Sequence, residues 1–361
     1  MHPTLTGRPT ALLVASLFVL SACRGTHASA TDAGAVSAAQ RFLTHYVDPD
    51  GRVVRRDQGD DTVSEGVGYA LLLSVAIGDR TTFDRVWSWT TDHLVQPSGV
   101  LASHWVGNAV VDPHSAADAD LQTAWALERA GRRWGSRYTA AATALARAAA
   151  EQDIGYDDAG RPVLAAGSWA VGGHGVPLTA EPGYWTAPAI AALAALTGDH
   201  RWQALEASHE ATLTALTSGG AALPADWITV GGGRATAPIP DPSSHQAPRC
   251  GQDGLRTVVW AALDPALKNL VARWSAQLTP RASATPLAVD LHGGVVDGGQ
   301  GPLFAVAAAA AAKAAGRTAA VQQDLVVADR ISAGYPTYYG SAWDALGRLL
   351  LTTNRLADPS T

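Results

Sequence analysis

Acidic residues stand where apolar helices are expected to begin. Glu65 opens "SEGVGYALLL", Asp118 and Asp120 open "DADLQTAWAL", and Asp253 opens "DGLRTVVWAAL". An acid in the first turn can simply cap a helix, because it complements the free amides and the helix dipole. Here each of these helices also follows a long loop. In a barrel of alternating helices the acids could meet at one mouth, and we therefore expect an acidic cleft suited to proton transfer.

Sequence templates for other chemistries are missing. The chain contains no C-x-x-C, H-E-x-x-H or G-x-S-x-G motif and no phosphate-binding glycine loop. The loops contain His104, His114, His174 and His245. These histidines lack the spacing of metal ligands. We therefore expect neither a metal nor a cofactor.

Two glycines lie beside Glu65 at the start of its helix. Glycine costs a helix interior roughly 1 kcal/mol relative to alanine, so Gly66 and Gly68 need a reason to be there. We expect that another group approaches this backbone closely.

The elements that position these residues are helices. Apolar residues at spacings of three and four predict helix after helix from about Ala35 onward. Glycine followed by a polar residue marks the boundaries between them, as in "AIGDRTTF" and "ALTGDHRW". The expected helices cover 35–46, 65–77, 81–94, 118–131, 136–150, 185–197, 199–217, 253–263, 264–278, 302–315, 317–329 and 339–351. Taken in pairs, they predict an all-α fold, the (α/α)6 barrel of six helical hairpins.

One domain accounts for most of the chain. No change in composition divides residues 36–352, and residues 353–361 form a short tail. The long segments between helices, at 47–63, 95–117, 151–183, 218–251 and 279–300, are rich in Gly, Pro, Asp and Trp. Loops of this length inside a domain are usually functional.

Composition narrows the class of ligand. The chain has 361 residues, 47% of them hydrophobic and 16% charged, with a formal net charge of -6. This charge and the lack of a basic stripe exclude nucleic acid as an expected partner. There are 12 Trp against 4 Phe. Indole combines a flat apolar face with a polar N–H, which suits sugar rings as well as core packing.

The N-terminal segment indicates export. Residues 1–22 carry Arg8 and then "ALLVASLFVL", an apolar run too short to span a bilayer but typical of a secretory signal. The run ends in "LSAC", which resembles a bacterial lipobox. We expect a lipoprotein signal peptide, lipidation of Cys23, a flexible tether over 23–35, and membrane contact through that anchor alone. The alternative is a secreted protein in which Cys23 is incidental.

Several segments together resemble family 8 of the glycoside hydrolases, which are bacterial β-1,4-glucanases and their relatives. The carrying segments, in chain order, are "DGRVVRRDQGDDTVSEG", "SEGVGYALLLSVAIGDRTTFDRVWSWT", "AADADLQTAWALERAGRRW", "EPGYWTAPAIAALAALTGDHRW", "ALPADWITV", "DGLRTVVWAAL" and "YYGSAWDALGRLLL". They extend over roughly residues 36 to 352. The resemblance implies an (α/α)6 barrel that hydrolyses internal β-1,4 glycosidic bonds with inversion.

The resemblance also implies roles for individual residues. Glu65 would be the general acid and Asp253 the general base. Asp118 would hold the sugar at the cleavage point, and Arg256 would orient Asp253 or a sugar hydroxyl. Gly66 would let a glucan chain pass close to its helix, as would Gly68. The implied substrate-binding aromatic residues are Trp105, Tyr184, Trp185, Trp227 and Tyr69.

The chain departs from the family pattern near these residues. Ala117 replaces Ser or Thr, Thr123 replaces Ile or Met, and Gln252 replaces an aromatic residue. Glu181 and Gly183 replace Asn and Ser. These departures concern the substrate subsites, so the family's xylanase and chitosanase activities remain alternatives to cellulose cleavage.

Two further functions also remain open. The chain could be a lipid-anchored glycan-binding protein without turnover. It could also be a different barrel enzyme, such as a polysaccharide lyase or an unsaturated-uronide hydrolase.

Overall fold

Two kinds of helix alternate in the computed structural model, which describes Met1 and residues 30–173, 175–218, 222–279 and 282–357. The first kind is mostly buried, as in α2, where residues 66–76 are all buried, although α6 buries only Ala189, Ile190, Ala192 and Leu193. Its members are α2 (Ser64–Ile77), α4 (Ala117–Trp134), α6 (Ala187–Thr197), α8 (Gln252–Ala261), α10 (Pro302–Ala314) and α12 (Tyr338–Thr352). Helices that are apolar all round belong in a core.

The second kind buries one stripe and exposes the other face. Its members are α1 (Ala30–Tyr46), α3 (Arg80–His93), α5 (Ser136–Gln152), α7 (His200–Ser218), α9 (Lys268–Leu278) and α11 (Thr318–Gly334). In α3, for example, Phe83, Val86 and Trp89 are buried while the opposite face is polar. Such helices cover an apolar core from outside.

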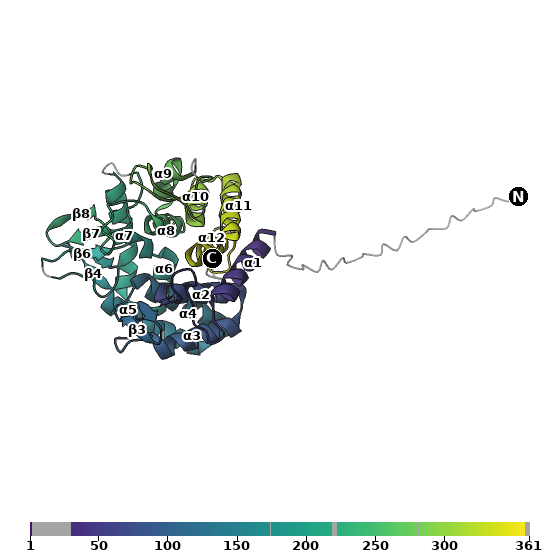
Figure 1. The fold of residues 1–361 in the computed structure, drawn as a ribbon, viewed down its shortest axis with the longest axis horizontal. Helices are drawn as coiled ribbons and strands as arrows, with labels where there is room; N and C mark the ends of the chain where they lie inside the picture. Colours follow the sequence, from purple (N-terminus) through teal and green to yellow (C-terminus); the bar gives the residue numbers. More distant parts are fainter. Residues whose placement is uncertain (2–29, 174, 219–221, 280–281, 358–361) are drawn as a thin grey trace.

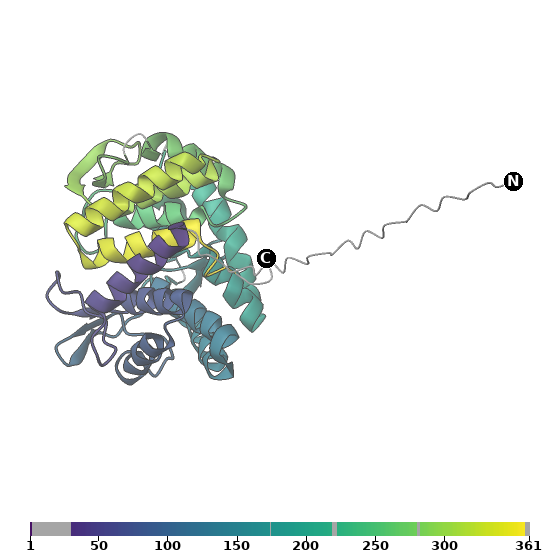
Figure 2. The same cartoon turned by 90° about the vertical axis from the view of Figure 1, so that its right-hand side faces the viewer.

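The buried helices form a closed ring. Each packs on the next, from α2 to α4, α6, α8, α10 and α12, and α12 packs back on α2. The other six helices surround this ring, and Figures 1 and 2 show α1 lying beside α12, so the first and last helices meet. The predicted (α/α)6 barrel is confirmed. Because each outer helix returns the chain to the same end, the inner helices all begin at one mouth.

The expected helix boundaries mostly hold. Gly78 ends α2 in the left-handed conformation (φ +82°), and the side chain of Asp79 accepts the Thr82 N–H to begin α3. Three boundaries differ by four or five residues: α1 begins at Ala30 rather than at 35, α11 ends at Gly334 rather than at 329, and α9 begins at Lys268 rather than at 264. Asp264 forms a turn instead, since its side chain accepts the backbone N–H of Ala266.

Short strands, which the sequence analysis did not predict, order the long loops. One antiparallel sheet joins β1 (Thr62–Val63), β2 (His104–Val106) and β3 (Ala109–Asp112), and another joins β6 (Leu178–Ala180), β7 (Ile228–Gly231) and β8 (Arg234–Pro238). Two hairpins pair β4 (Ile154–Tyr156) with β5 (Pro162–Leu164) and β9 (Pro286–Val289) with β10 (Val295–Gln300). Val63 pairs with His104 in the first sheet, so the loop carrying Trp105 is fixed to the start of α2.

The expected close approach to Gly66 and Gly68 is confirmed, but the approaching groups belong to the protein and not to a glucan chain. A Cβ at Gly66 would fall closer than 3.0 Å to the hydroxyl of Tyr338 on α12, and one at Gly68 would lie 3.1 Å from the Cβ of Gln122 on α4. The groups that approach this backbone are therefore side chains of neighbouring inner helices. The two glycines allow the inner ring to close tightly.

A buried pair of acids fastens the loops to the inner ring. Asp120 on α4 accepts the Leu101 N–H at 2.9 Å, and Asp153 accepts the Ser115 hydroxyl at 2.5 Å. The two buried carboxyl groups also interact with each other, and burial favours their protonated forms. Burial raises the pKa of Asp153 to about 7 and that of Asp120 well above its usual range.

Replacing Gly66 with alanine is expected to destabilise the fold. The new methyl group must displace Tyr338, and overpacking of this kind costs about 1–3 kcal/mol, which exceeds the helix propensity gained. Gly334→Ala, at the end of α11 with no atom within 4 Å of its Cβ, is the control and should stay within about 1 kcal/mol of wild type. Urea unfolding measures both free energies. Equal stability of the two variants would contradict this packing role.

The acid pair should make stability depend on pH. The folded protein retains a proton that free aspartate loses near pH 4, so the free energy of unfolding should fall between about pH 4 and pH 7. Asp153→Asn removes one of these protons and should reduce the slope by up to about 1.4 kcal/mol per pH unit. The exposed Asp92→Asn on α3 serves as control. The slope is measured by urea unfolding across this range. An unchanged slope in Asp153→Asn would show that the folded protein holds no extra proton on Asp153.

Candidate active site

Three of the predicted acids meet at the mouth of the barrel. Glu65 lies in the first turn of α2, Asp118 in that of α4 and Asp253 in that of α8. Since the inner helices begin at the same end, residues nearly two hundred positions apart become neighbours. Helix N-termini also favour carboxylates, because the free amides and the helix dipole present positive charge there.

Arg256 binds all three acids and a fourth. Its Nη1 donates to Glu65 Oε2 and to Asp118 Oδ2, both at 2.9 Å. Its Nη2 donates to Asp253 Oδ1 at 3.0 Å and to Glu181 Oε1 through a short contact. Glu65 and Asp253 therefore occupy different nitrogens of one planar guanidinium. They are close to each other but are bridged by the arginine.

The two outer carboxylates differ from the inner ones in exposure. The side chains of Glu65 and Asp253 are 20% and 30% exposed, whereas those of Arg256 and Asp118 are 2% and 1% exposed. Glu65 and Asp253 can therefore meet a ligand at the mouth. Asp118, which also accepts the Ala119 N–H at 2.8 Å, lies beneath them and contacts Arg256 rather than the opening.

The electrostatics of the cluster keep a proton on Glu65. Burial raises the pKa of Glu65 to about 7; the positive charge of Arg256 opposes this shift and the charges of Asp118 and Asp253 reinforce it. Burial likewise raises the pKa of Asp118. One arginine cannot compensate several carboxylates in a poorly solvated place, so part of the cluster stays neutral.

Glu181 and Asp226 are site residues that the search for helix-opening acids missed. Glu181 follows β6 and is 1% exposed. Asp226 accepts the backbone N–H groups of Gly251 and Gly254, at 2.6 and 2.7 Å, and so fixes the beginning of α8. Burial raises the pKa of Asp226 to about 7 and that of Glu181 well above its usual range. The one signal in the sequence was the unusual glutamate at position 181.

Tyrosines surround Arg256. The predicted residue Tyr69 is fully buried, and its hydroxyl lies 3.3 Å from Arg256 Nη1. The ring of Tyr184, also predicted, lies 5.0 Å from the guanidinium carbon, within the range of a cation–π contact. Tyr338 on α12 donates to Glu65 Oε1 at 3.5 Å. Tyr69 therefore supports the arginine from within, rather than lining the opening.

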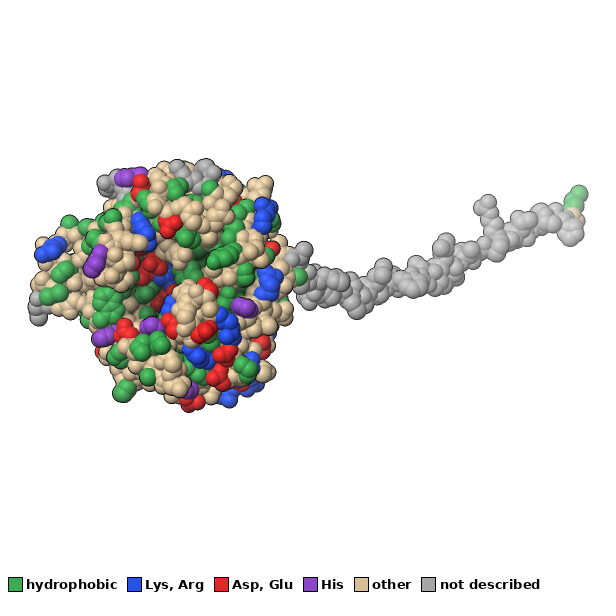
Figure 3. All heavy atoms as spheres, viewed as in Figure 1, with side chains coloured by type: hydrophobic (Ala, Val, Ile, Leu, Met, Phe, Trp, Pro, Cys, Tyr) green, Lys and Arg blue, Asp and Glu red, His purple; other side chains and the backbone are tan. Residues whose placement is uncertain are grey.

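Aromatic residues on the loops extend the site. Trp105 is half-buried and packs edge-on against Trp89 and His93. Trp227 is also half-buried, and its ring lies 6.3 Å from that of Trp169. Trp169 is 48% exposed and was missed by the sequence analysis, because an isolated loop tryptophan carries no periodicity. Figure 3 shows acidic and basic side chains gathered in a recess of the face drawn there.

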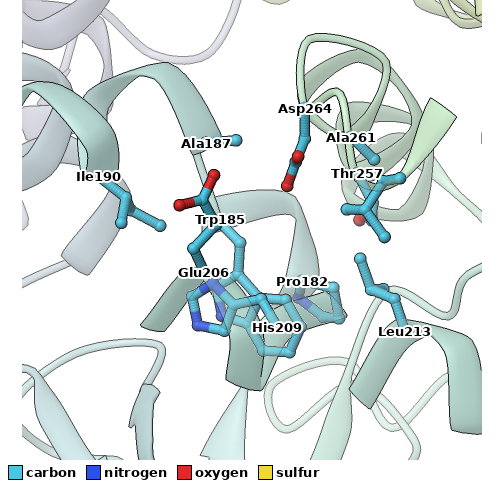
Figure 4. Close-up of a pocket in the computed structure, with 11 residues that line it drawn as sticks. Pro182, Trp185, Ala187, Ile190, Glu206, His209, Leu213, Thr257, Ala261 and Asp264 are labelled. Carbon is cyan, nitrogen blue, oxygen red and sulfur yellow. The ribbon is translucent and has the colours of Figure 1, made fainter. Parts of the chain in front are cut away.

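The expectation that Trp185 contacts substrate is corrected by its position. Its indole is 4% exposed, donates to the Leu164 carbonyl and stacks on His209 at 3.9 Å. Figure 4 shows these two rings together beside a small cavity between α6, α7 and α8. The cavity, about 20 Å³, has room for a single water. Burial lowers the pKa of His209 to about 3, so this stack is neutral packing.

The described ranges contain neither a metal site nor a membrane-spanning helix. No group of His, Cys, Asp and Glu within them has the arrangement of a metal site, and the clustered carboxylates turn to Arg256 instead. None of the helices that the structure describes is long and apolar enough to cross a bilayer. Cys23, the signal segment after Met1 and most of the tether lie outside the described residues.

Comparison with known proteins identifies the family. The sequence profile of "Glycosyl hydrolases family 8" matches residues 11–353. An endoglucanase from Cellulomonas uda is 31% identical over 250 residues, which is 68% of each chain. A family 8 endo-β-1,4-glucanase structure from an Achatina fulica gut metagenomic library is 25% identical, with a TM-score of 0.74 over 87% of this chain and 96% of that one.

A third relative supports the fold. The apo structure of a β-1,3-1,4-glucanase from Paenibacillus sp. X4 is 20% identical, with a TM-score of 0.77 over 91% of this chain and 93% of that one. The family profile covers nearly the whole chain, including the barrel and the carboxylate cluster. The chain therefore belongs to glycosyl hydrolase family 8, and it is a hydrolase of glycosidic bonds.

Proposed function

We propose that this protein is an inverting, endo-acting hydrolase of β-1,4-glucan, with Glu65 as the general acid and Asp253 as the general base. The observation that carries the proposal is the pair of carboxylates that reach the opening on separate nitrogens of one buried arginine. The relatives named endoglucanases support the glucan substrate. No cofactor is required for this reaction.

The reaction needs two opposite protonation states. Glu65, which holds its proton up to about pH 7, donates it to the glycosidic oxygen of the leaving sugar. A water attacks the anomeric carbon from the opposite face, and Asp253 accepts a proton from that water. The bond to the leaving oxygen breaks as the new bond forms, so the product has the inverted configuration. Inversion requires carboxyl groups about 6.5–9.5 Å apart, and a guanidinium between them is compatible with such spacing.

The remaining residues would position substrate and charge. Arg256 carries a permanent positive charge, which keeps Asp253 oriented and available as a base. We propose that Asp118 acts at the cleavage point by holding Arg256 from beneath, since its own side chain is almost sealed from the opening. Trp105, Trp169 and Trp227 would offer indole faces to successive sugar rings.

Removing either proposed catalytic carboxyl should abolish hydrolysis. Glu65→Gln and Asp253→Asn keep the shape of each side chain but cannot transfer the proton. The value of kcat should therefore fall by about 10²–10⁴-fold. Glu210→Gln on α7 is a matched control and should retain wild-type activity. Release of reducing ends from carboxymethyl-cellulose measures the rate, and proton NMR of the first product identifies its anomer.

Several outcomes would contradict the proposed function. A retained β-anomer would exclude inversion. Wild-type activity in Asp253→Asn would exclude Asp253 as the general base. Mixed-linkage glucan, xylan and chitosan should be tested in parallel, because preference for one of them would replace cellulose as the substrate. Binding without hydrolysis on all four would favour a glycan-binding protein, and unsaturated products would favour a lyase.

We further propose that the protein is exported and lipidated at Cys23. The "LSAC" sequence after a short apolar run supports this anchor. Cys23→Ser should abolish incorporation of a labelled fatty acid during expression in a bacterial host, whereas Cys250→Ser, a change at a buried cysteine, should not. Equal labelling of both variants would argue against lipidation of Cys23.

A further inference from the structure

Glu181 has no role in the proposed reaction, yet it contacts the group that holds the base. Its Oε1 accepts a hydrogen bond from Arg256 Nη2, the nitrogen that also donates to Asp253 Oδ1 at 3.0 Å. Its side chain is 2% exposed, so it does not reach the opening. Its one hydrogen-bond route to the base therefore runs through Arg256.

The backbone around Glu181 is shaped for this contact. Gly183 lies in a short 3-10 turn (Pro182–Tyr184), and a Cβ there would fall closer than 3.0 Å to the backbone oxygen of Asp253. The same Cβ would lie 3.3 Å from Glu181 Oε1. The departures at positions 181 and 183 are thus in contact: the small residue lets this turn approach α8, and the longer acid fills the place beside Arg256.

The charges facing Glu181 decide its protonation. They are Arg256 and Asp253 on α8, Asp118 on α4 and Asp226 in the loop before α8, with the Tyr184 hydroxyl nearby. Burial raises the pKa of Glu181 well above its usual range; the charge of Asp253 adds to this shift and Arg256 opposes it. An ionised Glu181 would also compete with Asp253 for one nitrogen.

We propose that Glu181 is a positioning residue for Asp253 that acts through Arg256 as a neutral carboxylic acid. In that form its carbonyl oxygen accepts the Nη2 hydrogen bond without neutralising the guanidinium, whose charge stays available to Asp253, Asp118 and Glu65. An asparagine, which the family pattern has at this position, is also a neutral acceptor. The protonated acid would thus accept the same hydrogen bond from Arg256 as the amide oxygen of asparagine. The kinetic consequence of this inference rests on the proposed function, whereas the protonation state of Glu181 does not.

Carbon-13 NMR of glutamate carboxyl groups tests the protonation without substrate. The chain contains six glutamates, so selective labelling gives few signals, and the signal lost in Glu181→Gln identifies Glu181. We expect this signal to remain at the protonated position through pH 7. The signal lost in Glu210→Gln provides the reference for a partly exposed glutamate. A Glu181 signal at the ionised position at pH 6 would overturn the proposal.

Kinetics test the positioning role. Glu181→Ala removes one acceptor from Nη2 and should lower kcat about tenfold or more while changing KM less than about twofold, because Glu181 does not touch the sugar. Glu181→Gln supplies a neutral acceptor and should restore kcat to within about threefold of wild type, with both limbs of the pH profile unmoved.

Other kinetic results would count against the inference. Wild-type kcat in Glu181→Ala would show that Nη2 needs no second acceptor. Loss of activity in Glu181→Gln equal to that in Glu181→Ala, or a shifted pH profile, would show that an ionised Glu181 is required. If wild type hydrolyses no glycan, the proposed function fails, and the NMR titration still decides whether Glu181 is neutral.

Discussion

The organisation of the site depends on one buried cation, Arg256. An arginine keeps its charge even in a poorly solvated interior, so its neighbours must supply the compensating negative charge. Four carboxyl groups, from three inner helices and one loop, accept its hydrogen bonds, and those that are ionised supply this charge. A lysine could not replace it, since an ammonium group lacks two separate nitrogens on which to hold Glu65 and Asp253 apart. Loss of the guanidinium would leave buried acids without a partner, which is costly.

The ring of inner helices makes this arrangement possible. Each hairpin returns the chain to the same end of the barrel, so every inner helix presents its N-terminus there. Those termini favour negative charge and help to offset the crowding of acids around Arg256. Tight contacts, such as Tyr338 against Gly66, fix the distance between adjacent helices and therefore between their first residues. Side-chain positions at the mouth thus follow from how the first turns of neighbouring inner helices pack.

Sequence patterns predicted the parts of the molecule that have local signals. Long apolar periodicities gave the helices, and Glu65, Asp118 and Asp253 were found because helix starts are recognisable, whereas Arg256 was implied by the family resemblance. The strands of two to six residues were missed because such short pairings depend on partners far along the chain. Glu181 and Trp169 lie in loops whose placement depends on the whole barrel, so their relation to other residues is not visible locally. Gly66 was noticed but explained wrongly, because its neighbour Tyr338 is 272 positions away.

The contact between α1 and α12 has a consequence for how the protein is made. These helices are the first and last of the domain, and an ion pair at 2.7 Å joins Asp32 in α1 to Arg355, which follows α12. The inner ring cannot close until residues 338–352 have left the ribosome. Pairings so distant along a chain form slowly, because the loop between them must first be brought together. Until those residues emerge, the barrel therefore stays an open arc with apolar helix faces exposed, which is the state most prone to aggregation.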